Sequence, residues 1–170
     1  KALDANDGTN TIIVSGGNYV LSDYQLRKSV TIIGKDNVVI TPTGNNYILN
    51  IGTGAKNVNL TRLTFANATK GAIGMSTSGS GTDSRTLAIS ECNFINNKGT
   101  VGVVSLYGAT TISKCNFINN TATSATGDFN GIISVRHGAS LTISYSNFIG
   151  NKNTASSSSA ISCIYAAPAK

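Results

Sequence analysis

The sequence contains few of the residues from which catalytic and metal sites are built. Among 170 residues there are one histidine, three cysteines and seven acids, and no two cysteines have the Cys-x-x-Cys spacing that zinc sites often use. No apolar stretch approaches the roughly 18 residues of a membrane span, so we expect no membrane insertion by this chain. We also expect no metal and no other cofactor.

Charge is scarce and dispersed. Charged residues make up 12% of the chain and give a net charge of +6, and the 13 Lys and Arg residues form no run longer than Arg27 and Lys28. A nucleic-acid-binding surface would gather its cations, so we expect no nucleic-acid partner. The gaps between short apolar runs are filled by Gly, Ser, Thr and Asn, a composition typical of an all-β protein rich in turns.

One line of the sequence recurs with little change. Residues 89–97 read ISECNFINN, residues 112–120 read ISKCNFINN, residues 143–151 read ISYSNFIGN, and a more divergent copy occupies residues 60–67. A second block, an apolar strand that follows a small residue, lies at residues 71–75, 102–106, 131–135 and 159–163. The chain is therefore built from repeated units, each with several short strands.

The repeat predicts a solenoid. Apolar residues alternate, as Leu87 and Ile89 do, which indicates strands rather than helices. Such short strands must bury their apolar faces by stacking on the next unit. We therefore expect an all-β, right-handed parallel β-helix with three strands per coil and roughly six to seven coils. It should form one domain over residues 1–170, as a segment of a larger protein, with residues 1–10 as a cap or linker and residues 166–170 as a linker.

The recurring aromatic and amide residues are predicted to stack along the axis. The phenylalanines should form a buried stack inside the coil: Phe94, Phe117 and Phe148. The asparagines should form an amide ladder at a turn, where Asn also tolerates a left-handed backbone: Asn97, Asn120 and Asn151. An exposed aromatic strip that binds sugars and an amide ligand site are the alternatives. The first conflicts with the apolar alternation, and a lone repeated amide specifies no chemistry.

Two cysteines occupy the same place in successive units. Cys92 and Cys115 should therefore lie one strand spacing apart, within the range that a disulfide allows. Both are expected to point inward, and the next copy has Ser146 there. We favour free, stacked thiols, because buried Cys behaves as a small hydrophobic residue, and the disulfide stays open as the alternative.

The positions of the acidic residues indicate whether the chain is an enzyme. Carbohydrate-cleaving β-helices use paired carboxylates or Asp clusters that hold calcium. None of the acids here recurs at a matching place in adjacent units: Asp4, Asp7, Asp23, Asp36, Asp83, Glu91 and Asp128. We therefore expect no enzyme, with a carbohydrate lyase or hydrolase as the alternative.

Binding is expected in the insertions. The insertions at residues 121–130 and 152–159 both follow the Phe-x-x-Asn turn, so they should emerge side by side from one edge of the solenoid. A third insertion, residues 76–85, should emerge elsewhere. The candidate binding residues of this rim are Asp128, Phe129, Asn130, Lys152 and Asn153. Alternatively, these polar insertions are loops that the fold tolerates and that bind nothing.

The line CNFINN followed by a Gly-initiated apolar strand, after the opening IIVSGGNYVLSDYQLRKSVTIIG at residues 12–34, resembles the adhesin-like surface proteins of methanogenic archaea. The resemblance covers residues 11–165. It implies that the chain is a segment of a larger extracellular surface protein that attaches to another cell, a glycan or a protein, and the family has no shared catalytic residues to carry over. We expect the segment to be a monomer. A passive stalk or spacer is the alternative. Three sequons, at Asn59, Asn67 and Asn119, fit a secreted protein.

Overall fold

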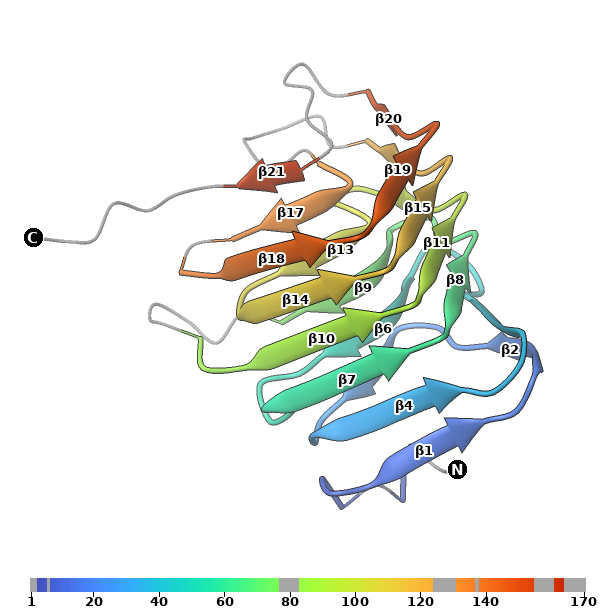
Figure 1. Cartoon of the computed structure of the whole chain (residues 1–170), viewed down its shortest axis with the longest axis vertical. Helices are drawn as coiled ribbons and strands as arrows, with labels where there is room; N and C mark the ends of the chain where they lie inside the picture. Colours follow the sequence, from blue (N-terminus) through green and yellow to red (C-terminus); the bar gives the residue numbers. More distant parts are fainter. Residues whose placement is uncertain are drawn as a thin grey trace, which may run out of the picture.

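The protein is an all-β solenoid of stacked parallel strands (Figure 1). The computed structural model describes residues 3–5, 7–76, 83–123, 131–136, 138–154 and 161–163. Over these residues, every strand pairs in parallel with its copy in the neighbouring turn, and the strands form four sheets. Because parallel strands need a crossover connection, each turn of the solenoid serves as the crossover for the next.

Three sheets have six strands each. Sheet A contains β1 (Thr11–Val14), β4 (Val30–Gly34), β7 (Asn57–Thr61), β10 (Thr86–Ser90), β14 (Ala109–Ser113) and β18 (Ser140–Ser144). Sheet B contains β2 (Gly17–Val20), β5 (Val38–Thr41), β8 (Thr64–Ala66), β11 (Asn93–Ile95), β15 (Asn116–Ile118) and β19 (Asn147–Ile149). Sheet C contains β3 (Tyr24–Leu26), β6 (Tyr47–Ile51), β9 (Gly71–Met75), β13 (Val104–Leu106), β17 (Ile133–Val135) and β21 (Ile161–Cys163).

A fourth sheet corrects the predicted cross-section of three strands per coil. Sheet D contains three short strands between sheets B and C: β12 (Lys98–Gly99), β16 (Thr121–Ala122) and β20 (Lys152–Asn153). Each follows one of the repeated asparagines Asn97, Asn120 and Asn151 directly, because the turn there keeps neighbouring backbones in register for two further residues. Turns that include a strand of sheet D have four strands, and the other turns have three. The predicted six to seven coils of three strands each therefore do not describe the protein.

The interior is a set of residue columns. In sheet A, inward-facing residues of successive strands stand in register and form one aliphatic column: Ile12, Ile32, Leu60, Ile89, Ile112 and Ile143. The four middle members are buried, whereas the two end members are partly exposed. Each turn therefore buries its apolar face against its neighbours, as expected for a solenoid.

Sheet B supplies the predicted aromatic stack. The ring centroids of Phe94 and Phe117 are 4.7 Å apart with planes 3° from parallel, and Phe117 and Phe148 repeat these values. Phe65 extends the stack, with its ring centroid 5.3 Å from that of Phe94. The predicted burial of Phe148 is wrong: it is only partly buried, because β19 is the last strand of sheet B in the described chain.

The predicted amide ladder is present inside the corner between sheets B and D, and Asn120 shows its pattern. Its Oδ1 accepts hydrogen bonds from the backbone N–H of Asn97 at 2.9 Å and from the side-chain Nδ2 of Asn97 at 3.1 Å. Its Nδ2 donates to the Phe94 carbonyl at 2.8 Å and to Asn151 Oδ1 at 3.0 Å. Asn97 and Asn120 are fully buried, so the ladder satisfies backbone groups that water does not reach.

The left-handed residue of this corner is the preceding one, which corrects the role predicted for the inner asparagines. Asn96 and Asn119 have φ of 55° and 53°, and Gly150 takes the same place with φ of 62°. Their backbone makes the turn, and the next Asn points inward. Of two adjacent asparagines, the first thus makes the turn and the second supplies the buried amide. Asn suits the first role because it tolerates a left-handed backbone better than most residues do.

We predict that Phe117→Ala lowers the free energy of unfolding by about 3–5 kcal/mol, because it opens a cavity in the stack. Denaturant unfolding followed by circular dichroism measures this change. Phe148→Ala is the matched control and should cost clearly less, because its ring is partly exposed. Equal losses for the two variants would show that stacking within the turns does not carry the burial energy.

Candidate functional site

The two insertions of the predicted rim leave the solenoid from neighbouring strands. Thr121 pairs with Lys152, and Ala122 pairs with Asn153. Just beyond these strands, the Thr123 N–H donates to the Gly99 carbonyl at 2.9 Å, and the Thr154 N–H donates to the Ala122 carbonyl at 3.0 Å. The roots of the two insertions therefore lie one strand spacing apart, as the sequence predicted.

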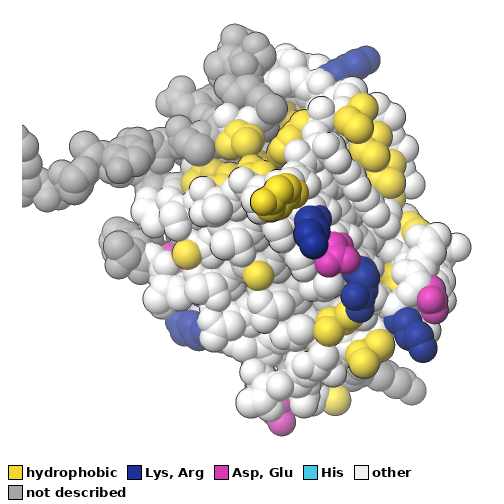
Figure 2. Space-filling view, in the orientation of Figure 1, with side chains coloured by type: hydrophobic (Ala, Val, Ile, Leu, Met, Phe, Trp, Pro, Cys, Tyr) yellow, Lys and Arg dark blue, Asp and Glu magenta, His cyan; other side chains and the backbone are white. Residues whose placement is uncertain are grey.

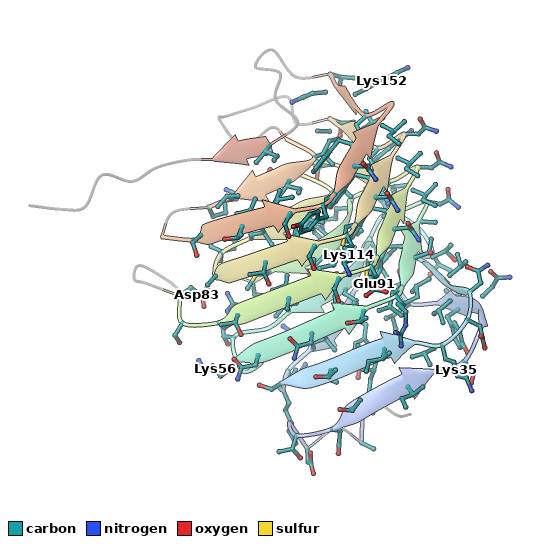
Figure 3. All side chains as sticks on the ribbon, viewed as in Figure 1. Lys35, Lys56, Asp83, Glu91, Lys114 and Lys152 are labelled. Carbon is teal, nitrogen blue, oxygen red and sulfur yellow. The ribbon has the colours of Figure 1, made fainter. Side chains whose placement is uncertain are left out.

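The structure places two of the five candidate rim residues. Lys152 is exposed on β20, at the upper end of the solenoid in Figure 3, and Asn153 beside it is partly buried. The other candidates, Asp128, Phe129 and Asn130, lie outside the described residues. The rim is thus defined at its base by strands β16 and β20.

The third insertion leaves from a different edge and is held by an ion pair that the sequence reasoning missed. Arg85, which is 1% exposed, forms a salt bridge with Asp83 and donates from Nη1 to the Ile51 carbonyl at 2.8 Å. Its Nη2 also donates to the Ser76 carbonyl. This contact joins the segment after β9 to the segment before β10. Asp83 therefore has a structural partner, and its removal would leave a buried cation unpaired.

The predicted free thiols are found in the corner between sheets A and B. Cys92 and Cys115 are buried and not bonded to each other. The sulfur of Cys115 lies 3.2 Å from the Ser113 carbonyl, and Ser146 Oγ donates to the Ser144 carbonyl at 2.9 Å in the next turn. The thiol thus takes the place of a hydroxyl, which explains how Ser146 can replace Cys in the copy that follows Cys115. Burial raises the pKa of both thiols, and that of Cys92 to about 12.

Because burial raises the Cys92 pKa, the thiol should stabilise the fold fully below its unfolded pKa, about 8.5. That contribution should be lost as the pH rises towards 12, since the unfolded chain releases its proton first. We predict that wild-type protein loses more unfolding free energy between about pH 8 and 11 than Cys92→Ser does.

Denaturant titrations of both proteins at several pH values measure this difference. In a Cys163→Ser background, a thiol reagent should label Cys92 and Cys115 only after unfolding, because the thiolate is the reactive form. Labelling of the native protein, or parallel pH profiles for the two proteins, would contradict the prediction.

On the face seen in Figure 2, charged side chains lie mainly around the edges of sheet A. Its outer face is almost uncharged in Figure 2, and one outward column in register reads Thr11, Thr31, Asn59, Ala88, Thr111 and Thr142. At the corner with sheet B, Arg62, Glu91 and Lys114 follow successive strands with φ near 53°. Glu91 and Lys114 lie beside each other in Figure 3. The alternating signs place opposite charges next to each other along the corner.

A groove lies on the outer face of sheet C. It has a volume of about 380 Å³, and its lining residues are Asp23, Gln25, Tyr47, Asn50, Lys70 and Ser76. The Lys70 Nζ lies 5.4 Å from the centre of the Tyr47 ring, and Asn50 Nδ2 donates to Asp23 Oδ1. The groove therefore combines an aromatic ring, a cation, a carboxylate and amides.

Two glycines make room for the Tyr47 ring. A Cβ atom on Gly71 would lie 2.5 Å from Tyr47 Cε1, and one on Gly74 would lie 3.2 Å from the same atom and 2.5 Å from Asn50 Oδ1. Gly71 also has φ of 147°, which side chains disfavour. Sequence reasoning missed this site, because the ring and its glycines come from different turns. The pair Gly71 and Gly74 within one strand was the available signal.

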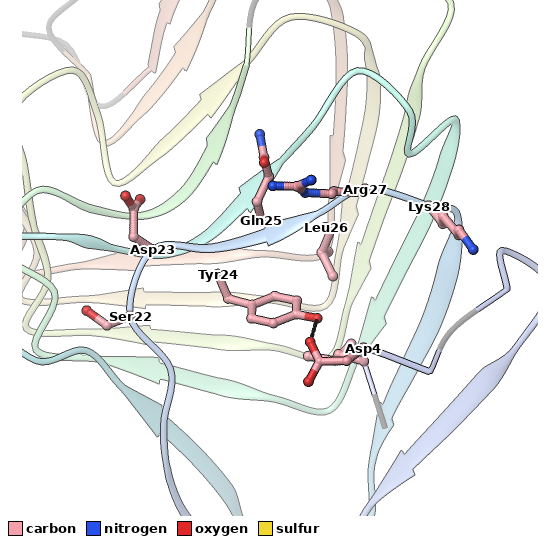
Figure 4. A pocket seen from close by; sticks show the side chains of 9 residues that line it. Asp4, Ser22, Asp23, Tyr24, Gln25, Leu26, Arg27 and Lys28 are labelled. Atoms are coloured by element: carbon pink, nitrogen blue, oxygen red, sulfur yellow. Dashed lines mark hydrogen bonds between the residues drawn. The ribbon is translucent and has the colours of Figure 1, made fainter. Parts of the chain in front are cut away.

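A second cavity, of about 630 Å³, lies at the first turn, between residues 3–4 and the segment 22–28 (Figure 4). The Tyr24 hydroxyl donates to Asp4 Oδ1 at 2.7 Å, and burial together with this bond raises the pKa of Tyr24 to about 12. The same hydrogen bond lowers the pKa of Asp4. Because these two polar groups satisfy each other, the contact ties the N-terminal segment to β3.

The sequons occupy accessible places. Asn59 is exposed on sheet A and donates from Nδ2 to Thr31 Oγ1 at 3.1 Å. Asn67 and Asn119 are exposed in the left-handed corner after sheet B, with φ of 60° and 53°. All three side chains are therefore within reach of solvent in the folded protein.

The described residues contain no group of three or more His, Cys, Asp and Glu side chains placed to hold a metal ion. They also contain no helix that is long and apolar enough to cross a membrane. Comparison of the sequence with protein-family models and with curated proteins finds no match.

Proposed function

We propose that this chain is an extracellular, non-catalytic, adhesin-like segment of a cell-surface protein, and that it attaches to another cell, a surface glycan or a protein. We propose the right-handed form of the solenoid, since parallel crossovers are right-handed in nearly all known cases. We also propose that the chain belongs to the adhesin-like surface proteins of methanogenic archaea. The segment acts as a monomer and needs no cofactor.

The pairing of β16 with β20 carries this proposal. Recognition usually resides in loops that a rigid scaffold positions, and here two insertions start from adjacent strands of one sheet. The scaffold beneath them is rigid, because stacked rings and a buried amide ladder fix successive turns relative to each other. This arrangement supports a binding rim with Lys152 and Asn153 at its base, and the other proposed binding residues, 128–130, belong to the insertion that follows β16.

A passive spacer would need the same stacked interior but not the rim. We predict that shortening both insertions, to the length of the compact link at residues 100–103, abolishes adhesion to partner cells and leaves the thermal midpoint nearly unchanged. Shortening within residues 77–82 is the matched control, because that insertion leaves from another edge and the Asp83–Arg85 pair is kept. Undiminished adhesion by the folded rim variant would favour the spacer.

A further inference from the structure

We propose that the groove on the outer face of sheet C binds a neutral saccharide. The inference gives the proposed attachment function a ligand class and rests on that function for its setting, but it concerns a different face from the rim. The groove is open, and none of its six lining residues is fully buried. Its volume of about 380 Å³ is within the range of small-molecule sites. One or two sugar units of a longer chain can therefore lie in it.

The two charged residues that line the groove have opposite signs. Lys70 brings one positive charge and Asp23 one negative charge, and Arg136 acts on Tyr47 from outside the lining. An anionic ligand would face Asp23, and a cationic ligand would face Lys70, so a strongly charged ligand meets repulsion on one side. A neutral ligand meets none.

The same groups offer both donors and acceptors, as sugar hydroxyls require. Lys70 only donates and Asp23 only accepts, whereas Gln25 and Ser76 do both. Burial raises the pKa of Tyr47, so its hydroxyl remains a donor at neutral pH. Because every sugar hydroxyl donates and accepts, a polyhydroxylated ligand can satisfy this mixed set, which a purely apolar ligand would leave unpaired.

The groove is organised before any ligand arrives. The edge of the Tyr47 ring occupies the space that side chains on Gly71 and Gly74 would need, and Lys70 lies over its face. Asn50 is held by its hydrogen bond to Asp23. Side chains already fixed in place lose little entropy on binding. Tyr47 lines the groove, so the part of its ring that Lys70 does not cover offers an apolar surface to the C–H groups of a sugar.

The test uses the whole chain and a fixed panel of trisaccharides. Neutral trimers of glucose, mannose, galactose and N-acetylglucosamine, with trigalacturonic acid as the acidic comparison, are titrated at millimolar concentration. Amide NMR shifts report binding. We expect at least one neutral trimer to shift the resonances of Gly71, Gly74 and the Asn50 side chain, and chromatography to recover that trimer uncleaved.

Variants then assign the site. Lys70→Met and Gln25→Ala should each weaken binding by about tenfold, as expected for contacts near the centre of a small site. Tyr145→Ala is the matched control, because Tyr145 is 86% exposed at the corner between sheets A and B, and it should leave binding unchanged. Thermal midpoints confirm that each variant is folded.

The outcomes are separable from those of the adhesion test. The rim-shortened protein should still bind the neutral trimer. The groove proposal can therefore hold when the rim proposal fails, and the rim proposal can hold when the groove proposal fails. If no neutral trimer shifts the groove resonances, if only trigalacturonic acid does, or if Lys70→Met and Gln25→Ala both bind normally, the inference is wrong.

Discussion

The buried amide ladder at the corner between sheets B and D is the interaction on which the repeated turns of the solenoid depend. At this corner the backbone turns inside the protein, and its N–H groups would lose water without gaining a partner, at a cost of about 1–3 kcal/mol each. Asn97 and Asn120 accept these N–H groups and donate to the carbonyls of Phe65 and Phe94 in the turn below. The ladder therefore couples the amide column to the ring stack and fixes the register of both. A slip of one residue would turn the rings outward.

The fixed register determines where the two proposed binding surfaces can lie. Because the corners are determined by one left-handed residue and one inward residue, extra chain can be inserted between strands without disturbing the columns. The rim begins where β16 and β20 end, and the groove forms where Gly71 and Gly74 leave room beside Tyr47. Both proposed surfaces thus depend on the same rigid interior, but they lie on different sheets, so we propose that they act independently.

The sequence predicted those features in which a residue stacks on its own copy. The stacked rings, the inner amides and the free thiols were all found, because repetition itself indicates a column. It did not predict sheet D, whose strands of two residues have no apolar alternation. It also assigned the left-handed backbone to Asn97 and Asn120 rather than to their neighbours, since two adjacent asparagines look alike in sequence. The Asp83–Arg85 pair and the Tyr47 groove have no copies, so no repeat pointed to them.

A double-mutant cycle on Asn97→Ala and Asn120→Ala tests the amide ladder most directly, with unfolding free energies measured in denaturant. Each single variant should lose several kcal/mol. The double variant should lose less than their sum, with a coupling energy of about 1 kcal/mol or more, because the two amides share hydrogen bonds. Asn96→Gly and Asn119→Gly, at the exposed left-handed positions, should be additive and nearly neutral. Additive losses for the inner pair, or a change below about 0.5 kcal/mol for Asn120→Ala, would contradict the account.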